Sequence, residues 1–120
     1  MDTDRLTYAI IGCGMAVSSE LGCGFLESVY RRALAHSLRK AGLQVESERA
    51  FRVLYGGVIV GDYRADLIVG DAVIVEVKAL KVLTSAHHAQ LLNYLKASCL
   101  PVGLILNFGN PRLEVRRMVN

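Results

Sequence analysis

The chain has 120 residues, of which 52% are hydrophobic, and its 14 basic and 11 acidic residues give a formal net charge of +3. This length and apolar content are sufficient for one hydrophobic core, so we expect a single domain over residues 1–120. The charge falls well short of that of a protein that coats nucleic acid. Composition therefore leaves the class of binding partner open.

Signals for export or membrane insertion are missing from the sequence. Cys13, Cys23 and Cys99 are odd in number and form no Cys-x-x-Cys pair, which is typical of reduced structural thiols. The chain begins with Asp2 and Asp4 rather than a basic stretch, and no apolar run reaches the length of a membrane span. We therefore expect a cytoplasmic protein that does not bind a membrane.

Two helices are predicted in the first third of the chain. From about residue 4 to residue 20, apolar residues recur at steps of three and four, and Leu21-Gly22 is expected to close this helix. A second apolar stripe predicts a helix over about 25–40, which Gly42 would end. Most of its basic residues fall on the other side, and we interpret them as a solvated face near a C-terminus whose dipole favours cations. They are Arg31, Arg32, Arg39 and Lys40.

After these helices the hydrophobic period changes to two, which predicts strands. Turn signals at Gly56-Gly57 and Gly70-Asp71 divide this region into three antiparallel strands over about 44–55, 58–69 and 72–79.

The last third of the chain predicts a helix followed by one or two strands. The helix is expected from about Ser85 to Ser98, with Thr84 or Ser85 as its N-cap. The apolar run 102–108 is typical of a buried strand, and residues 113–119 indicate one more strand at an edge. The order ααβββαβ(β) predicts an α/β (α+β) fold, with a central mixed sheet flanked by helices.

Three charged residues interrupt the apolar strands. Glu76 and Lys78 are two positions apart in the run 73–79, so they share one face of a strand. Charges do not enter a buried strand without a partner or a function. Asp66 lies in the preceding strand, and a three-residue loop over 70–72 would place it opposite Glu76. A two-residue turn would place it on the other face instead.

Carboxylates at one point of a sheet offer the hard oxygen ligands that Mg²⁺ or Mn²⁺ requires. Such a metal lowers the pKa of bound water and neutralises charge that develops on a phosphate. Lys78 would orient or deprotonate the attacking water, or stabilise the transition state. Asp66, Glu76 and Lys78 are therefore the groups that a phosphodiesterase needs.

Asp66 followed by Glu76-Val77-Lys78 resembles the signature of the PD-(D/E)XK nuclease superfamily. The segment Gly24 to Tyr30, with Glu27 between them, matches the motif that names its GxxExxY branch. The resemblance covers nearly the entire chain and implies a restriction endonuclease-like core. It also implies that Asp66 and Glu76 are metal ligands and that Lys78 is the catalytic lysine.

The resemblance further implies that Glu27 completes the metal site from a helix. Glu27 shares a stripe with Tyr30 and Leu34, so its carboxylate is expected to face the protein. An ordinary surface ion pair with Arg31, one turn later, is the alternative.

Gln90 and Tyr94 are one turn apart and resemble the Gln-x-x-x-Tyr helix of RecB-like nucleases. The resemblance implies that Gln90 supports the lysine or the scissile phosphate and that Tyr94 faces the substrate backbone. A tyrosine that caps the sheet and a glutamine that satisfies a strand edge are the structural alternative. Arg64 is a candidate phosphate ligand, although arginines on edge strands are usually solvated. His87 and His88 point about 100° apart on a helix and lack a third ligand, so we interpret them as surface or substrate-proximal residues.

The chain departs from this family at two places. Relatives commonly carry Glu-x-His where this chain has Ala16-Val17-Ser18, and a proline where it has Cys23. Any contribution of that histidine to catalysis or assembly is lost here.

We therefore predict a metal-dependent nuclease that uses Mg²⁺ or Mn²⁺ and favours DNA over RNA. Its small size and modest charge lead us to expect a homodimer. The alternative is a catalytically inactive nucleic-acid-binding or assembly domain that keeps the fold, and an enzyme for a small phosphoester would need a closed pocket. A purely structural cluster of buried ion pairs is a poor choice, because apolar replacements often stabilise more.

Overall fold

The computed structural model describes residues 1–120 and contains three helices and seven strands. In chain order they are α1 (Thr3–Leu21), α2 (Glu27–Lys40), β1 (Val45–Ser47), β2 (Ala50–Tyr55), β3 (Val58–Arg64), β4 (Leu67–Val69), β5 (Val73–Lys78), α3 (Ser85–Ser98), β6 (Val102–Asn107) and β7 (Glu114–Val119). No helix is both long and apolar enough to cross a membrane.

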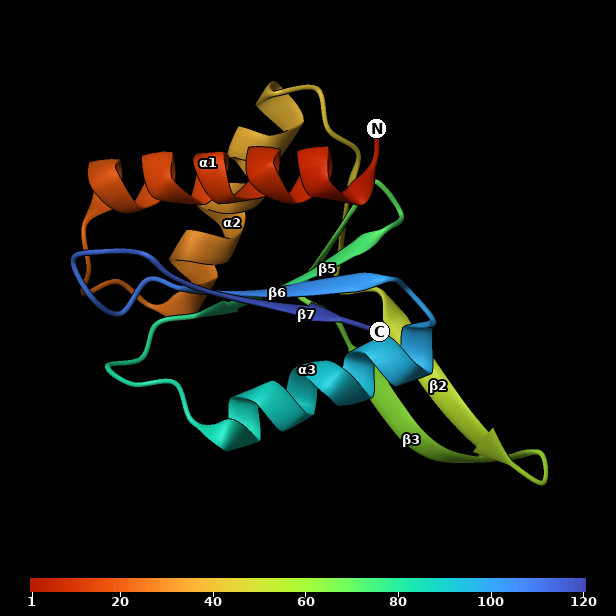
Figure 1. Cartoon of the computed structure of the whole chain (residues 1–120). Coiled ribbons are helices and arrows are strands. Elements are labelled where there is room, and N and C mark those ends of the chain that lie inside the picture. The colour runs from red at the N-terminus through yellow and green to blue at the C-terminus, as the bar shows by residue number, and fades with distance from the viewer.

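The strands form a five-stranded sheet in the order β1-β4-β5-β6-β7 and a separate hairpin of β2 and β3. Within the larger sheet β5 and β6 run parallel, while the other neighbours are antiparallel. Helices α1 and α2 cover one face of this sheet and α3 covers the other (Figure 1). The predicted mixed sheet flanked by helices is confirmed, and the arrangement is that of a restriction endonuclease-like fold.

The sheet divides the hydrophobic core into two parts. Val73, Val75 and Val77 of β5 pack in the larger part, against α1 and α2. Ile74 packs in the smaller part with Leu91 of α3. Because alternate residues of a strand point to opposite faces, Glu76 and Lys78 share the side of Ile74 and face α3.

The two long strands expected over 44–55 and 58–69 are each broken in the structure. Glu48 has a left-handed φ of 56°, and its backbone N–H donates to the carbonyl of Asp66 over 3.1 Å. Next to this contact, the N–H of Ala65 donates to the carbonyl of Arg49 over 3.1 Å. Both strands turn at this point, so β1 and β4 stay in the main sheet while β2 and β3 leave it.

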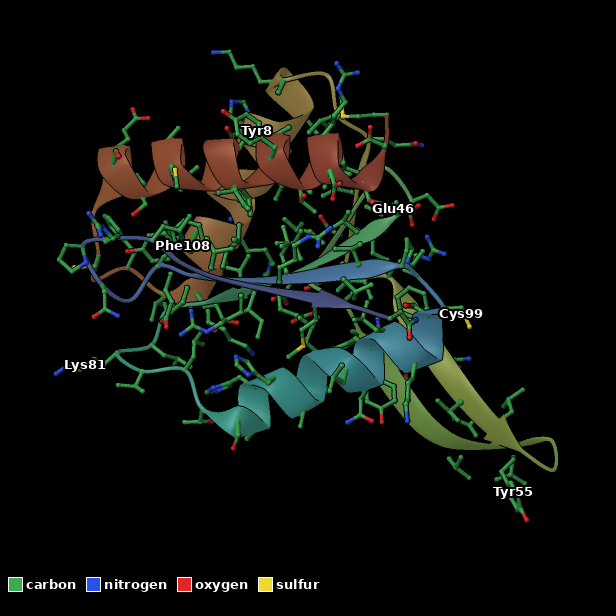
Figure 2. The ribbon with its side chains drawn as sticks, viewed as in Figure 1. Tyr8, Glu46, Tyr55, Lys81, Cys99 and Phe108 are labelled. Carbon is green, nitrogen blue, oxygen red and sulfur yellow. The ribbon has the colours of Figure 1, made fainter.

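The β2–β3 hairpin extends beyond the sheet (Figure 1), and the side chains exposed at its far end are mostly apolar. Figure 2 shows Tyr55 at the tip, pointing away from the rest of the molecule. The exposed apolar residues here are Val53, Leu54, Tyr55, Val58, Ile59 and Val60. Their cost in water is not offset by any packing within the chain.

Candidate active site

The loop between β4 and β5 determines which side chains meet at the site. Leu67 pairs with Val75 and Val69 pairs with Val73, so three residues, 70–72, form the connection. This register continues to place Asp66 opposite Glu76, on one face of the sheet. The three-residue loop that the sequence analysis requires is confirmed.

Each of the two carboxyl groups accepts a hydrogen bond from the backbone of the opposite strand. The N–H of Val77 donates to Asp66 Oδ2 over 2.8 Å, and the N–H of Asp66 donates to Glu76 Oε1 over 3.3 Å. Regular pairing of β4 with β5 starts only at Leu67. The carboxyl groups therefore satisfy backbone donors at the point where the strands separate.

Glu76 is only 3% exposed, which is unusual for an acid. Burial, together with the nearby carboxyl of Asp66, raises the pKa of Glu76 to about 9. Lys78 acts in the opposite direction but has a smaller effect. At neutral pH the carboxyl group of Glu76 is therefore protonated in the metal-free protein.

Replacement of Glu76 by glutamine is expected to stabilise the metal-free protein. The folded-state pKa of Glu76 lies above its unfolded value, so its favourable contribution is complete below about pH 4.5 and declines as pH rises toward about 9. Glutamine cannot ionise, so the free energy of unfolding of Glu76→Gln should exceed that of wild type near pH 8.5, and the difference should shrink as pH falls toward about 4.5. Urea unfolding in EDTA at several pH values measures this difference.

The matched control for this prediction is Glu46→Gln, because Glu46 lies exposed on β1. Its unfolding free energy should follow the wild-type dependence on pH. If the unfolding free energies of wild type and Glu76→Gln depended on pH in the same way, the raised pKa of Glu76 in the folded protein would be contradicted.

The third helix presents polar side chains to the acids. Lys78 Nζ donates to Gln90 Oε1 over 3.4 Å. Tyr94 is nearly buried and packs edge-on against Tyr63, with the ring centroids 5.5 Å apart. Burial and the neighbouring carboxyls of Glu76 and Asp66 raise the pKa of Tyr94 to about 12, so its phenol is protonated at neutral pH.

Lys78 does not neutralise the two acids. The ion pairs in the structure involve other residues, namely Arg31–Glu48, Arg49–Glu46, Arg49–Asp71, Arg116–Glu114 and Arg117–Asp4. A structural cluster of buried ion pairs is therefore not what the chain builds from Asp66, Glu76 and Lys78.

Glu27 begins α2 and reaches this site from the layer on the opposite face of the sheet. Burial raises its pKa, and Lys78 opposes this shift while Asp66 adds to it, so both lie within electrostatic range. The alternative, a surface ion pair with Arg31, is not formed, because Arg31 lies 3.8 Å from Glu48 instead. The structure thus brings Glu27 toward Asp66 and Lys78.

The loop before Glu27 is held by Tyr30. The Tyr30 hydroxyl donates to the carbonyl of Gly22 over 2.6 Å and accepts from the N–H of Phe25 over 3.2 Å. Its fully buried ring stacks on Phe108, labelled in Figure 2, with centroids 4.8 Å apart. Gly24 between them has a φ of 113°, which favours glycine strongly. The spacing of Gly24, Glu27 and Tyr30 therefore positions the start of α2.

Two other residues considered in the sequence analysis lie at the margin of the site. His87 Nδ1 accepts from the N–H of Thr84 over 2.9 Å, which caps α3 at the predicted N-cap, and the ring is near enough to Glu27 to lower its pKa. Arg64 is exposed on β3 and makes no side-chain hydrogen bond or ion pair with the other site residues. The structure therefore does not join Arg64 to the acids.

Asn107 is a structural residue of the site that the sequence analysis did not identify. It is fully buried; its side chain accepts from the N–H of Leu80 and donates to the carbonyl of Leu80, each over 2.8 Å. The neighbouring N–H of Phe108 donates to the carbonyl of Lys78 over 2.8 Å. These contacts fix the chain just after Lys78. In the sequence, the indication of this role is a single amide side chain within the apolar run 102–108.

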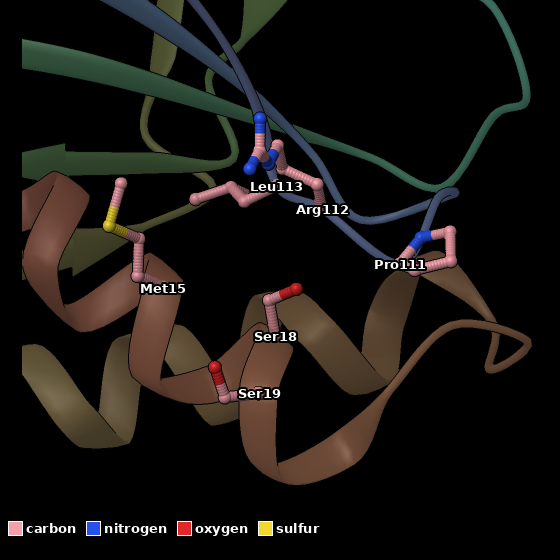
Figure 3. Close-up of a pocket in the computed structure, with 6 residues that line it drawn as sticks. All are labelled: Met15, Ser18, Ser19, Pro111, Arg112 and Leu113. Carbon is pink, nitrogen blue, oxygen red and sulfur yellow. The ribbon is translucent and has the colours of Figure 1, made fainter.

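None of the hollows in the structure is lined by Asp66, Glu76, Lys78 or Glu27. The largest, about 560 Å³, opens between the end of α1 and the segment before β7 (Figure 3). It is lined by Met15, Ser18, Ser19, Pro111, Arg112 and Leu113. Ser18, at one of the two departures noted in the sequence, therefore lies at this hollow and not at the site of Asp66. The closed pocket that a small phosphoester would need is not formed around the acids.

The donor chemistry of the site fits a hard divalent cation. No group of three or more histidine, cysteine or acidic side chains is arranged as a metal site by itself. Mg²⁺ is usually bound by one or two carboxylates, with water and substrate phosphates as its other ligands. The opposed carboxyls of Asp66 and Glu76 meet that requirement.

Comparison with known proteins agrees with this geometry. The family model of the PD-(D/E)XK nuclease superfamily matches residues 4–118. No curated protein and no solved structure matches the chain. Nucleases of this superfamily typically use divalent metals to cut nucleic acid. With a match over nearly its full length, the chain belongs to the PD-(D/E)XK nuclease superfamily.

Proposed function

We propose that this protein is an Mg²⁺- or Mn²⁺-dependent nuclease that hydrolyses phosphodiester bonds, with DNA as its preferred substrate. One observation carries the proposal: the carboxyl groups of Asp66 and Glu76 meet on one face of the sheet, beside Lys78, without an ion-paired cation. Such a pair binds a divalent metal more readily than it serves a purely structural purpose.

Each side chain has a role in this proposal. Asp66 and Glu76 would hold the metal, and Glu27 would complete the site from α2. When bound there, a divalent metal would supply Lewis-acid chemistry for water and for the scissile phosphate. Lys78, held by Gln90, orients the water or stabilises the transition state. The protonated phenol of Tyr94 donates to the substrate backbone, and Arg64 contacts a phosphate farther along.

We further propose that the chain belongs to the GxxExxY branch and that residues 1–120 act as one domain. The conformation of Gly24 and the contacts of Tyr30 supply a physical reason for that motif, since both position Glu27. A homodimer is proposed because a net charge of +3 gives one copy little basic surface for a nucleic acid. Cleavage assays over a range of protein concentrations test whether activity requires the dimer.

The decisive experiment is cleavage of labelled single- and double-stranded DNA and RNA in Mg²⁺, Mn²⁺ or EDTA. We expect wild type to cut DNA only with metal, and Asp66→Asn to be at least about 100-fold slower, because the amide no longer supplies a charged ligand. Asp71→Asn is the matched control, since Asp71 is an exposed acid in the loop that follows β4.

Two results would contradict the proposal. One is the absence of cleavage by well-folded wild type on every substrate, which favours a nucleic-acid-binding or assembly domain. The other is equal activity of Asp66→Asn and Asp71→Asn, which would separate any cleavage from the two opposed carboxyls.

A further inference from the structure

A group of basic side chains lies on the outer side of α2. Arg31 and Arg39 are two turns apart, and Arg32 and His36 are one turn apart in the adjacent row. We call these four residues the α2 basic cluster. The sequence predicts a solvated face for the basic residues of this helix, but in the structure three of them line one hollow together with His36.

The α2 basic cluster surrounds a hollow of about 310 Å³. Its other lining residues are Ala35, whose small side chain is nearly buried, and Ser47 at the end of β1. Guanidinium, imidazole and hydroxyl groups that converge around a small apolar residue form a site for phosphate oxygens.

Little negative charge opposes the cluster. Arg31 lies 3.8 Å from Glu48, whose side chain is 64% exposed. Arg39 donates to the carbonyl of Val45 over 3.2 Å, which leaves its charge uncompensated. Arg32 and His36 are exposed and make no side-chain hydrogen bond or ion pair. The hollow therefore offers positive charge to an anion from outside the chain.

The cluster begins about one turn of α2 after Glu27, an acid of the proposed active site. The backbone N–H of Glu48 donates to the carbonyl of Asp66 over 3.1 Å, while the carboxylate of Glu48 faces Arg31. Along α2, Arg31 follows Glu27 by about one turn, and Arg39 lies roughly 18 Å from Glu27 at about 1.5 Å per residue. The basic residues thus begin about one turn from Glu27 and lead away from it along α2.

We propose that the α2 basic cluster binds phosphates of the DNA strand several nucleotides away from the bond that is cut. This inference rests on the proposed function and adds the path of the substrate. A DNA strand rises about 3.4 Å per phosphate, so it presents about five phosphates over the length from Glu27 to Arg39. Glu48 competes with one of these phosphates for Arg31.

The test measures binding of a labelled DNA duplex of about 20 base pairs in EDTA, where no cleavage occurs. The double variant Arg32→Ala/Arg39→Ala should bind about tenfold more weakly, and the slope of log K against log salt should become shallower by about two. Glu48→Gln should bind about two- to threefold more tightly, because the competing charge is removed.

The matched control removes two arginines from the opposite edge of the sheet, on β7, as Arg116→Ala/Arg117→Ala. It should bind DNA as wild type does. Wild-type affinity and salt slope in Arg32→Ala/Arg39→Ala would overturn the proposal, and so would an equal loss in the β7 control, which would reveal a dependence on net charge alone. The proposal would also be overturned if the cluster bound an RNA duplex but no DNA duplex.

The same measurements separate the cluster from the nuclease reaction. If wild type cleaves DNA and the variant Arg32→Ala/Arg39→Ala binds the DNA duplex as wild type does, the proposal for the α2 basic cluster is refuted and the nuclease proposal stands. Weakened binding of this variant, in a protein that never cleaves with any metal, refutes the nuclease proposal and supports the cluster.

Discussion

A Lys78→Ala variant should cleave nucleic acid at least about 1,000-fold more slowly than wild type, a loss of about 4 kcal/mol of transition-state stabilisation. Lys78 is half-buried on the face that carries Asp66 and Glu76, and its ammonium is directed to Gln90. Loss of a group that positions water or meets developing charge costs about 10²- to 10⁴-fold. Initial rates on the best substrate of the cleavage panel measure the effect.

The control for this prediction is Lys81→Ala, because Lys81 is exposed on the loop after β5 and points away from the sheet in Figure 2. It should retain wild-type rates. The loss in Lys78→Ala should fall on kcat, with unchanged DNA binding in EDTA, because the ammonium acts on the reaction more than on the ground state. A loss confined to KM would place Lys78 among the binding groups instead.

An Asn107→Ala variant should lose about 3 kcal/mol of unfolding free energy. Its side chain bonds both backbone groups of Leu80 and also bonds Glu114 and the N–H of Gly109, each within 3.1 Å. Alanine would leave the partly buried N–H and carbonyl of Leu80 without partners, and each unsatisfied group costs about 1–3 kcal/mol. Urea unfolding monitored by circular dichroism gives this difference.

Asn110→Ala provides a matched control three residues later. Asn110 makes one side-chain hydrogen bond, to the carbonyl of Lys81 over 2.9 Å, in an exposed setting. Its loss should cost less than about 1 kcal/mol. Equal stability of the two variants would show that Asn107 does not hold the chain after Lys78.

The helices, the order of the elements and the pairing of β4 with β5 could be predicted from local signals. The helix over 85–98 has its predicted bounds, and the other helices begin within about two residues of expectation. The facing of Asp66 and Glu76 followed from a strand period of two and from the loop over 70–72. These features depend on neighbours in sequence.

The breaks in the long strands depend on contacts distant in sequence, so no local pattern predicts them. Glu48 adopts a left-handed conformation at a non-glycine position, stabilised by its bond to Asp66 eighteen positions later. The pairing of Lys78 with Gln90, rather than with an acid, likewise depends on how α3 packs. Asn107 bonds to Leu80, 27 positions earlier in the chain. One asparagine in an apolar run does not indicate which residue it contacts.

The hydrogen bonds of the two acids bear on how this chain would evolve. Asp66 accepts a hydrogen bond from the backbone N–H of Val77, so selection for stability alone would act against its loss. Glu76 accepts one from the N–H of Asp66, but its raised pKa means that glutamine at this position would stabilise the metal-free protein. Lys78 and Gln90 bond only to each other through their side chains, and no backbone group depends on them. In a lineage that had abandoned the reaction, Lys78, Gln90 and Glu76 would therefore be free to change, while Asp66 would persist. Retention of Lys78 is accordingly a better mark of continuing activity than retention of Asp66.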